Sequence, residues 1–135
     1  MGDNKRPKIK LEWSKVDYFI EWLGWLMLMG LWLLVLINHP SLPEIIPTHF
    51  NFSGHIDGYG SKQLIFNMPV LATVLFVGMT WLNKFPHLFN YPVKITTENA
   101  HSQYKIGTRL IRWLKLMVVV VMIASVYSIL AKAKY

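Results

Sequence analysis

The sequence contains no cysteine, so disulfide bonds, thiolate nucleophiles and cysteine-ligated metal sites are excluded. Charged residues are also scarce. They make up 16% of the 135 residues, against roughly 25% in an average soluble domain. Hydrophobic residues make up 53%. This balance favours a membrane protein over a soluble domain, because long apolar runs need few charges only where lipid surrounds them.

The few charges are mostly basic, and the net charge is +7. On a soluble protein such an excess indicates nucleic-acid binding. Here no basic stripe is interleaved with exposed aromatic residues, so we predict no nucleic-acid partner. The Lys and Arg residues flank apolar runs instead, where they would meet the anionic lipids of a membrane surface. The lipid bilayer is therefore the first predicted partner.

Three apolar runs hold most of the hydrophobic residues. We predict one membrane domain over residues 1–135, with transmembrane helices at about 16–38, 64–83 and 107–131. At 1.5 Å per residue the first run is roughly 35 Å long, enough to cross a hydrocarbon core of about 30 Å. The predicted fold class is an all-α membrane protein with three transmembrane helices and a short structured extracytoplasmic loop.

Local signals predict where the first helix begins and ends. Ser14 followed by Asp17 resembles a capping box, which starts a helix. The dipeptide His39-Pro40 should end it, because the residue before a proline is biased away from helical geometry.

The second and third helices carry signals of their own. Pro69 lies inside the second apolar run and predicts a kink near Asn67, because proline lacks a backbone donor. Thr97 is the candidate N-cap of the third helix. A helix from Glu98 would be longer than the membrane is thick, so its first turns should project into the cytoplasm.

The basic residues are unevenly divided between the two sides of this arrangement. A cytoplasmic N-terminus places eleven of the 14 Lys and Arg residues inside and three outside. The positive-inside rule favours that orientation. We therefore predict a multi-pass protein of the cell (inner) membrane with a cytoplasmic N-terminus and an extracytoplasmic C-terminus. Residues 39–63 then form an outer loop, and residues 84–106 a cytoplasmic segment.

Four charges fall within the predicted helices near the cytoplasmic side. Asp17 and Glu21 share one face of the first helix, and Arg112 and Lys115 share one face of the third. An unpaired charge is costly in a membrane. We therefore predict inter-helix ion pairs between these two pairs of residues. Alternatively Glu21 belongs to a proton or ion path, but no further acidic residue continues toward the membrane centre.

The outer loop is rich in turn and strand signals. Polar and apolar residues alternate over 49–53, as in a half-buried strand. Asp57-Gly58 is a tight-turn signal. These patterns predict a short strand or β-hairpin, with Phe50 and Phe52 packed onto the helix ends.

The same loop contains His49, His55 and Asp57, which are residue types that bind zinc and other transition metals. Their spacing matches no established zinc signature, and no HExxH helix supplies a general base. Polar residues in a turn explain them better. We predict no metal and no cofactor, and we keep a metal-dependent envelope enzyme as an alternative.

Two segments carry a family resemblance. In the outer loop the matching residues are Pro43, Pro47, His49, Asn51, Gly54, Asp57, Gly58, Gly60 and Lys62. Before the third helix they are Asn90, Pro92, Asn99 and Tyr104. With these residues the chain resembles the bacterial family called domain of unknown function 1648. The resemblance extends to the N-terminal region of SdpI-like immunity proteins, which implies protection against a toxic peptide and signalling to a repressor.

Together these observations favour a non-enzymatic module of the immunity or signalling type. It would bind another membrane protein or an extracellular peptide through the outer loop. The candidate binding residues are His49, Asn51, Gly54, Asp57, Gly58 and Lys62. An accessory subunit of a larger membrane complex is the alternative, because the lipid-facing surfaces of three spans can dock on another protein.

Overall fold

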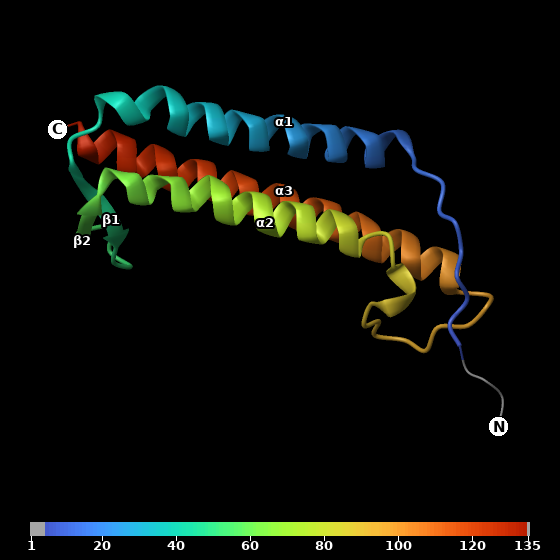
Figure 1. Cartoon of the computed structure of the whole chain (residues 1–135). Helices are drawn as coiled ribbons and strands as arrows, with labels where there is room; N and C mark the ends of the chain where they lie inside the picture. The colour runs from blue at the N-terminus through green and yellow to red at the C-terminus, as the bar shows by residue number, and fades with distance from the viewer. Residues whose placement is uncertain (1–4, 135) are drawn as a thin grey trace.

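The computed structural model describes residues 5–134 as three long helices and one β-hairpin. The helices are α1 (Lys15–Asn38), α2 (Asn67–Leu82) and α3 (Ala100–Ala133), and the strands are β1 (Ile45–Phe50) and β2 (Ile56–Ser61). The helices lie side by side in one bundle, with the hairpin at one end beside the C-terminus (Figure 1). We call this end, residues 39–66, the hairpin end. The opposite end, residues 5–14 and 83–99, is the loop end.

Three segments have the length and apolar composition of membrane spans: Lys15–Ser41, Lys62–Leu82 and Ala100–Ala133. Their outward faces carry large apolar side chains. They include Leu26, Met29, Leu33 and Ile37 of α1, Val74 and Val77 of α2, and Leu110 and Val121 of α3. In water such a surface would aggregate, whereas lipid covers it without cost. The predicted fold, a multi-pass membrane protein with three spans and a hairpin after the first, is confirmed.

The signals at both ends of α1 act as predicted. The backbone N–H of Asp17 donates to Ser14 Oγ over 3.3 Å, and the N–H of Ser14 donates to Asp17 Oδ2 over 2.9 Å. This reciprocal capping box starts the helix. The helix ends at Asn38, directly before His39-Pro40, which open a short 3₁₀ helix (His39–Ser41).

The other two helices begin differently from the prediction. A 3₁₀ helix (Lys62–Phe66) leads into α2, which becomes α-helical at Asn67. Pro69 thus lies in the first turn, where a helix has unbonded N–H groups in any case, rather than in the interior. The helix α3 begins at Ala100 with Asn99 at the N-cap position, so the predicted N-cap Thr97 was wrong.

The core lies between the three helices and extends under the hairpin. Its fully buried members include Leu31, Val35, Ala72, Phe76, Val119, Val126 and, from β1, Ile46. Helices α1 and α2 approach closely at Gly24, where a Cβ atom would lie 2.9 Å from Cε2 and Cζ of Phe76. Only a glycine permits this approach, because a side chain there would displace the ring.

The hairpin turn lies at residues 51–55 and not at Asp57-Gly58, so that part of the prediction was wrong. The Oδ1 atom of Asn51 accepts the backbone N–H groups of Ser53 and His55, each over 3.0 Å. Gly54 has φ +80°, which a glycine adopts without strain. An Asn side chain that bonds its own following backbone is a strong turn former, and it prevails here over the Asp-Gly pair.

Asp57 and Gly58 instead lie within β2, where Gly58 pairs with His49 of β1. Phe50 is half-buried and packs on the core as predicted. The prediction for Phe52 was wrong, since its side chain is fully exposed at the turn.

Candidate functional site

The predicted binding residues all lie on the hairpin or at its base, but they do not converge on one point. His49 and Asp57 face each other across the two strands, with Nδ1 of the histidine hydrogen-bonded to Oδ1 of the carboxylate. Their side chains are 70% and 44% exposed. Asn51 and Gly54 form the turn. The structure thus gives these residues mainly architectural partners within the hairpin.

The candidate metal ligands do not form a ligand group. His55 lies exposed in the turn, and within residues 5–134 the ring of His49 hydrogen-bonds Asp57. Within residues 5–134 no group of three or more His, Asp or Glu side chains is placed to hold a metal ion. A metal site needs about three protein ligands in contact with one ion, so this geometry gives the metal-enzyme alternative no support.

Two lysines bind the hairpin, one at its tip and one at its base. Lys132 Nζ donates to the carbonyl oxygen of Gly54 over 2.8 Å and lies 4.9 Å from the centre of the Phe50 ring. At the base of the hairpin, Lys62 Nζ lies 2.9 Å from Glu44 Oε1, and this hydrogen bond lowers the pKa of the Glu44 carboxyl. The first contact ties the hairpin tip to α3, and the second, an exposed pair, closes the base of the hairpin.

Large apolar side chains remain exposed on this hairpin. Phe52 at the turn, Tyr59 on β2 and Ile45 on β1 are each at least 60% exposed. The sheet has two strands, so the outer edge of each strand has no partner strand among the described residues. A groove of about 560 Å³ runs between β1 and α3, with Thr48, Phe50, Ala124 and Ser128 among its walls.

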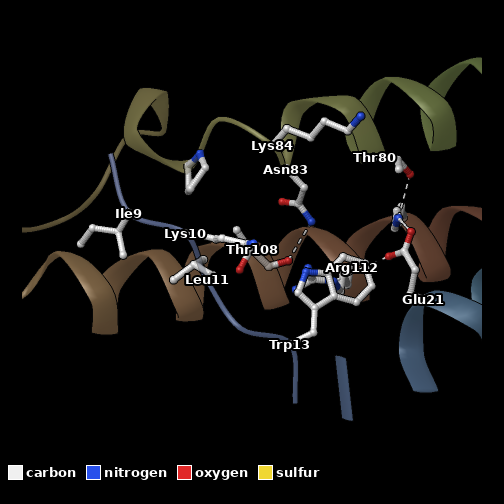
Figure 2. A pocket seen from close by; sticks show the side chains of 12 residues that line it. Ile9, Lys10, Leu11, Trp13, Glu21, Thr80, Asn83, Lys84, Thr108 and Arg112 are labelled. Atoms are coloured by element: carbon white, nitrogen blue, oxygen red, sulfur yellow. Dashed lines mark hydrogen bonds and ion pairs between the residues drawn. The ribbon is translucent and has the colours of Figure 1, made fainter. Parts of the chain in front are cut away.

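A second polar cluster lies between the helices near the loop end. Lys115 Nζ lies 2.6 Å from Glu21 Oε1 and donates to Thr80 Oγ1 over 2.7 Å. The Lys115 residue is 1% exposed and Glu21 is 7% exposed. Trp25 Nε1 also donates to Glu21 Oε1, over 3.2 Å. The buried ammonium group of Lys115 on α3 therefore links all three helices, because Glu21 lies on α1 and Thr80 lies on α2 (Figure 2).

The remaining predicted partners lie one turn nearer the loop end. Arg112 Nη1 lies 3.5 Å from Asp17 Oδ1, and Arg112 Nε lies 3.7 Å from Glu21 Oε2. The guanidinium carbon lies 4.2 Å from the centre of the Trp13 ring, a cation–π distance. The structure therefore brings all four predicted charges into one cluster, with Arg112 between the two carboxylates.

The sequence reasoning missed Arg109 and Thr80. Arg109 Nε donates to Asp17 Oδ1 over 3.0 Å, and its Nη2 donates to Ser14 Oγ over 3.0 Å. The spacing of Arg109, Arg112 and Lys115, each three residues apart, places all of them on one helical stripe and could have revealed the first of these. Thr80 gave no such signal, because its role depends on how α2 packs against α3.

The ionic cluster lies at the edge of the apolar slab. Residues 22–38 of α1 and 116–131 of α3 contain no Asp, Glu, Lys or Arg. At 1.5 Å per residue these stretches span about 24–26 Å, slightly less than a hydrocarbon core of about 30 Å. Hence the cluster lies near the lipid headgroups at the loop end, and the hairpin lies at the opposite surface.

A cavity of about 400 Å³ opens beside this cluster. We call it the loop-end cavity. Its walls come from the N-terminal segment (residues 9–13), the end of α2 and the following residues (80–86), and the charged stripe of α3 (Figure 2). Asn83 Nδ2 donates to the carbonyl oxygen of Thr108 over 3.0 Å and so fixes the amide at the cavity wall.

Residues 26–73 match the sequence model of a family described as Domain of unknown function (DUF1648). The resemblance to that family is confirmed over these residues, whereas the second resembling segment, with Asn90, Pro92, Asn99 and Tyr104, lies outside the match. The match covers the C-terminal part of α1, the hairpin and the start of α2. An uncharacterized protein of Archaeoglobus fulgidus is 33% identical over 70 residues, which are 46% of this chain and 38% of the relative. The chain therefore spans less than half of that relative's length. No solved structure matches.

Proposed function

We propose that the protein is a non-enzymatic module of the cell (inner) membrane that binds an extended segment of another membrane protein or an extracellular peptide through its hairpin. The observation that carries this proposal is the exposure of Phe52, Tyr59 and Ile45 on a hairpin that Lys132 ties to α3 and whose Ile46 lies in the core. Exposed aromatic side chains on a rigid support are typical anchors of a binding surface.

The strand edges suggest how such a segment would bind. An extended peptide can pair with the free edge of a sheet, where backbone hydrogen bonds supply affinity and side-chain pockets supply specificity. The groove beside β1 offers one such pocket, lined by Thr48 and Phe50. Lys132 at the same groove could meet an acidic group of the ligand. An immunity or signalling role would follow if the segment belongs to a toxic peptide or to a signalling partner.

The proposed orientation places the N-terminus and the ionic cluster at the cytoplasmic side and the hairpin outside. The chain has no cysteine, so single cysteines can report this orientation. The exposed residues Ser53, in the hairpin turn, and Ser102, near the start of α3, suit the substitutions Ser53→Cys and Ser102→Cys. A membrane-impermeant maleimide should label the first in intact cells and the second only after permeabilisation. The reverse pattern would invert the topology.

Site-specific photo-crosslinking tests the binding surface. A photoreactive amino acid at Phe52 or Tyr59 should give a discrete crosslinked product in native membranes, whereas the same probe at the lipid-facing Leu33 should give none. Mass spectrometry of the product then identifies the partner. Absence of crosslinks from both hairpin positions would contradict the proposal. Crosslinks only from Leu33 would favour the accessory-subunit alternative, in which the helices make the contact.

A further inference from the structure

Two residues that line the loop-end cavity each have a buried polar atom for which the described chain provides no hydrogen-bond partner. Arg112 Nε and Asn83 Oδ1 are both buried, and neither has a partner among residues 5–134. The nearest carboxylate oxygen to Arg112 Nε is that of Glu21, at 3.7 Å, beyond hydrogen-bond range. Arg112 is only 4% exposed. Buried polar atoms normally have partners, so each of these two is available to bond a ligand in the cavity once its side chain turns toward it.

The charges around the cavity favour an anion. Four cationic side chains line it, and they face a single carboxylate, Glu21. The cations are Lys10, Lys84, Arg112 and Lys115. Asp17, the other carboxylate of the ionic cluster, does not line the cavity; it bonds Arg109 and Ser14 and lies 3.5 Å from Arg112 Nη1. A guanidinium with a free N–H and two lysines at the mouth is a donor set that suits phosphate oxygens.

The remaining features restrict the ligand further. Asn83 Oδ1 can only accept a hydrogen bond, so the ligand needs a hydroxyl or amine beside its phosphate. The apolar wall formed by Ile9, Leu11 and Trp13 suits the glycerol and upper acyl region of a lipid. The cavity also lies at the edge of the apolar slab, at the depth of phospholipid headgroups.

The cavity wall is held in place by the N-terminal segment. The hydroxyl of Tyr104 donates to the carbonyl oxygen of Pro7 over 2.8 Å. Arg6 Nη1 donates to the carbonyl oxygens of His87 and Phe89. Residues 5–14 therefore cross the loop end as an anchored strap, and the backbone around the cavity is in place before any ligand binds. Pre-formed sites bind small ligands without a cost for ordering the chain.

We propose that the loop-end cavity binds a phosphate ester that also carries hydroxyl or amine groups. Two sources share this chemistry: the headgroup of a phospholipid in the adjacent leaflet and a soluble phosphate ester. In this proposal the phosphate lies between Arg112, Lys10 and Lys84. The Asn83 side chain turns so that its Oδ1 accepts a hydrogen bond from the hydroxyl or amine.

Binding of short-chain lipids to the purified full-length protein in non-ionic detergent tests this proposal, with native mass spectrometry and calorimetry as readouts. The probes are dioctanoyl-phosphatidylglycerol, dioctanoyl-phosphatidylcholine, glycerol phosphate and inorganic phosphate. Phosphatidylglycerol supplies both the phosphate and hydroxyl donors, whereas the choline headgroup has no donor for Asn83. We expect phosphatidylglycerol to bind at least about tenfold more tightly than phosphatidylcholine, the factor that one well-made hydrogen bond provides.

Two charge-matched double variants separate the cavity from general attraction to anionic lipid. The variant Lys10→Gln/Lys84→Gln removes the cations at the mouth, and Lys94→Gln/Lys105→Gln removes two exposed lysines of the same end that do not line the cavity. The first should weaken phosphatidylglycerol binding by about tenfold or more, because charge-assisted hydrogen bonds are lost, and the second by less than about twofold. Equal losses, or no binding to the unmodified protein, would overturn the proposal.

A second comparison examines the buried arginine. Arg112→Lys keeps the charge but removes Nε, and Arg109→Lys makes the same change at a residue outside this cavity. Only the first should weaken lipid binding, and similar effects of both would count against the site. If glycerol phosphate binds the unmodified protein as tightly as the lipid does, the ligand is a soluble ester. If the lipid binds more tightly, its source is the membrane.

Discussion

The buried contact between Glu21 and Lys115 should be one of the strongest tertiary interactions of this protein. Lys115 Nζ lies 2.6 Å from Glu21 Oε1, and both residues are more than nine-tenths buried. The substitution Glu21→Leu keeps the side-chain volume but leaves the ammonium group with only Thr80 as a polar partner. Removing one member of a buried ion pair typically costs about 3–5 kcal/mol of unfolding free energy. We expect a loss of that size.

The opposite substitution should cost less. In Lys115→Met, Glu21 keeps the N–H of Trp25 at 3.2 Å and the guanidinium of Arg112 at 3.7 Å. We therefore expect a loss of about 1–3 kcal/mol, the range for a buried polar group that loses one partner. The double variant replaces the pair with two apolar side chains of similar size. It should be more stable than Glu21→Leu alone, because no uncompensated charge remains.

Reversible unfolding in mixed micelles, followed by circular dichroism, gives the four free energies of this cycle. The exposed pair of Glu44 and Lys62 provides the control, and its cycle of Glu44→Gln and Lys62→Met should show a much smaller coupling because solvent screens it. The reasoning is refuted if the losses of Glu21→Leu and Lys115→Met simply add in the double variant. Additivity would mean that the two side chains do not stabilise each other.

Two further predictions concern packing and burial. Gly24→Ala should destabilise the bundle by about 1–3 kcal/mol, because the added Cβ would lie 2.9 Å from the ring of Phe76. As the control, Gly30→Ala adds a Cβ with no atom within 4 Å and should leave the unfolding temperature unchanged or raise it. Equal effects of the two substitutions in a thermal melt would rule out the close approach at Gly24. Burial raises the pKa of Tyr91 to about 12, above the ordinary tyrosine pKa near 10. The neutral phenol therefore contributes its full stabilisation below about pH 10, and this contribution is lost as the pH rises through 12. In an ultraviolet titration, Tyr91→Phe should remove a component with a midpoint near pH 12, and loss of a component near pH 10 would contradict this assignment.

The features that the sequence predicted correctly depend on local patterns. The capping box of Ser14 and Asp17 uses residues three apart, so it forms wherever the chain is helical. The end of α1 before His39-Pro40 follows from the steric effect of proline on its neighbour. The three spans follow from the length of the apolar runs.

The errors occurred where two local signals competed. Asp57-Gly58 and the segment from Asn51 to Gly54 are both turn formers, and only one could occupy the hairpin tip. The strand pairing decided between them, because Gly58 lies against His49, where a Cβ atom would come within 3.0 Å of the histidine Cβ. The same register places Phe50 on the core and leaves Phe52 exposed. Alternating polar and apolar residues predict that the two faces of a strand differ, but they do not predict the residue at which the strand ends.

The sequence by itself determined that this chain crosses a membrane three times, because the length of an apolar run is a property of each helix alone. It also determined that the few intramembrane charges must meet, because an unpaired charge in a membrane is costly on any helix. The tertiary structure decided which charges pair. The packing of α2 against α3 brought Thr80 to Lys115, and the crossing of α1 brought Asp17 to Arg109 as well as Arg112. It also decided that a strap of N-terminal residues closes a cavity over the same cluster. These contacts join residues up to about a hundred positions apart, and no local period in the sequence encodes which of them will be neighbours.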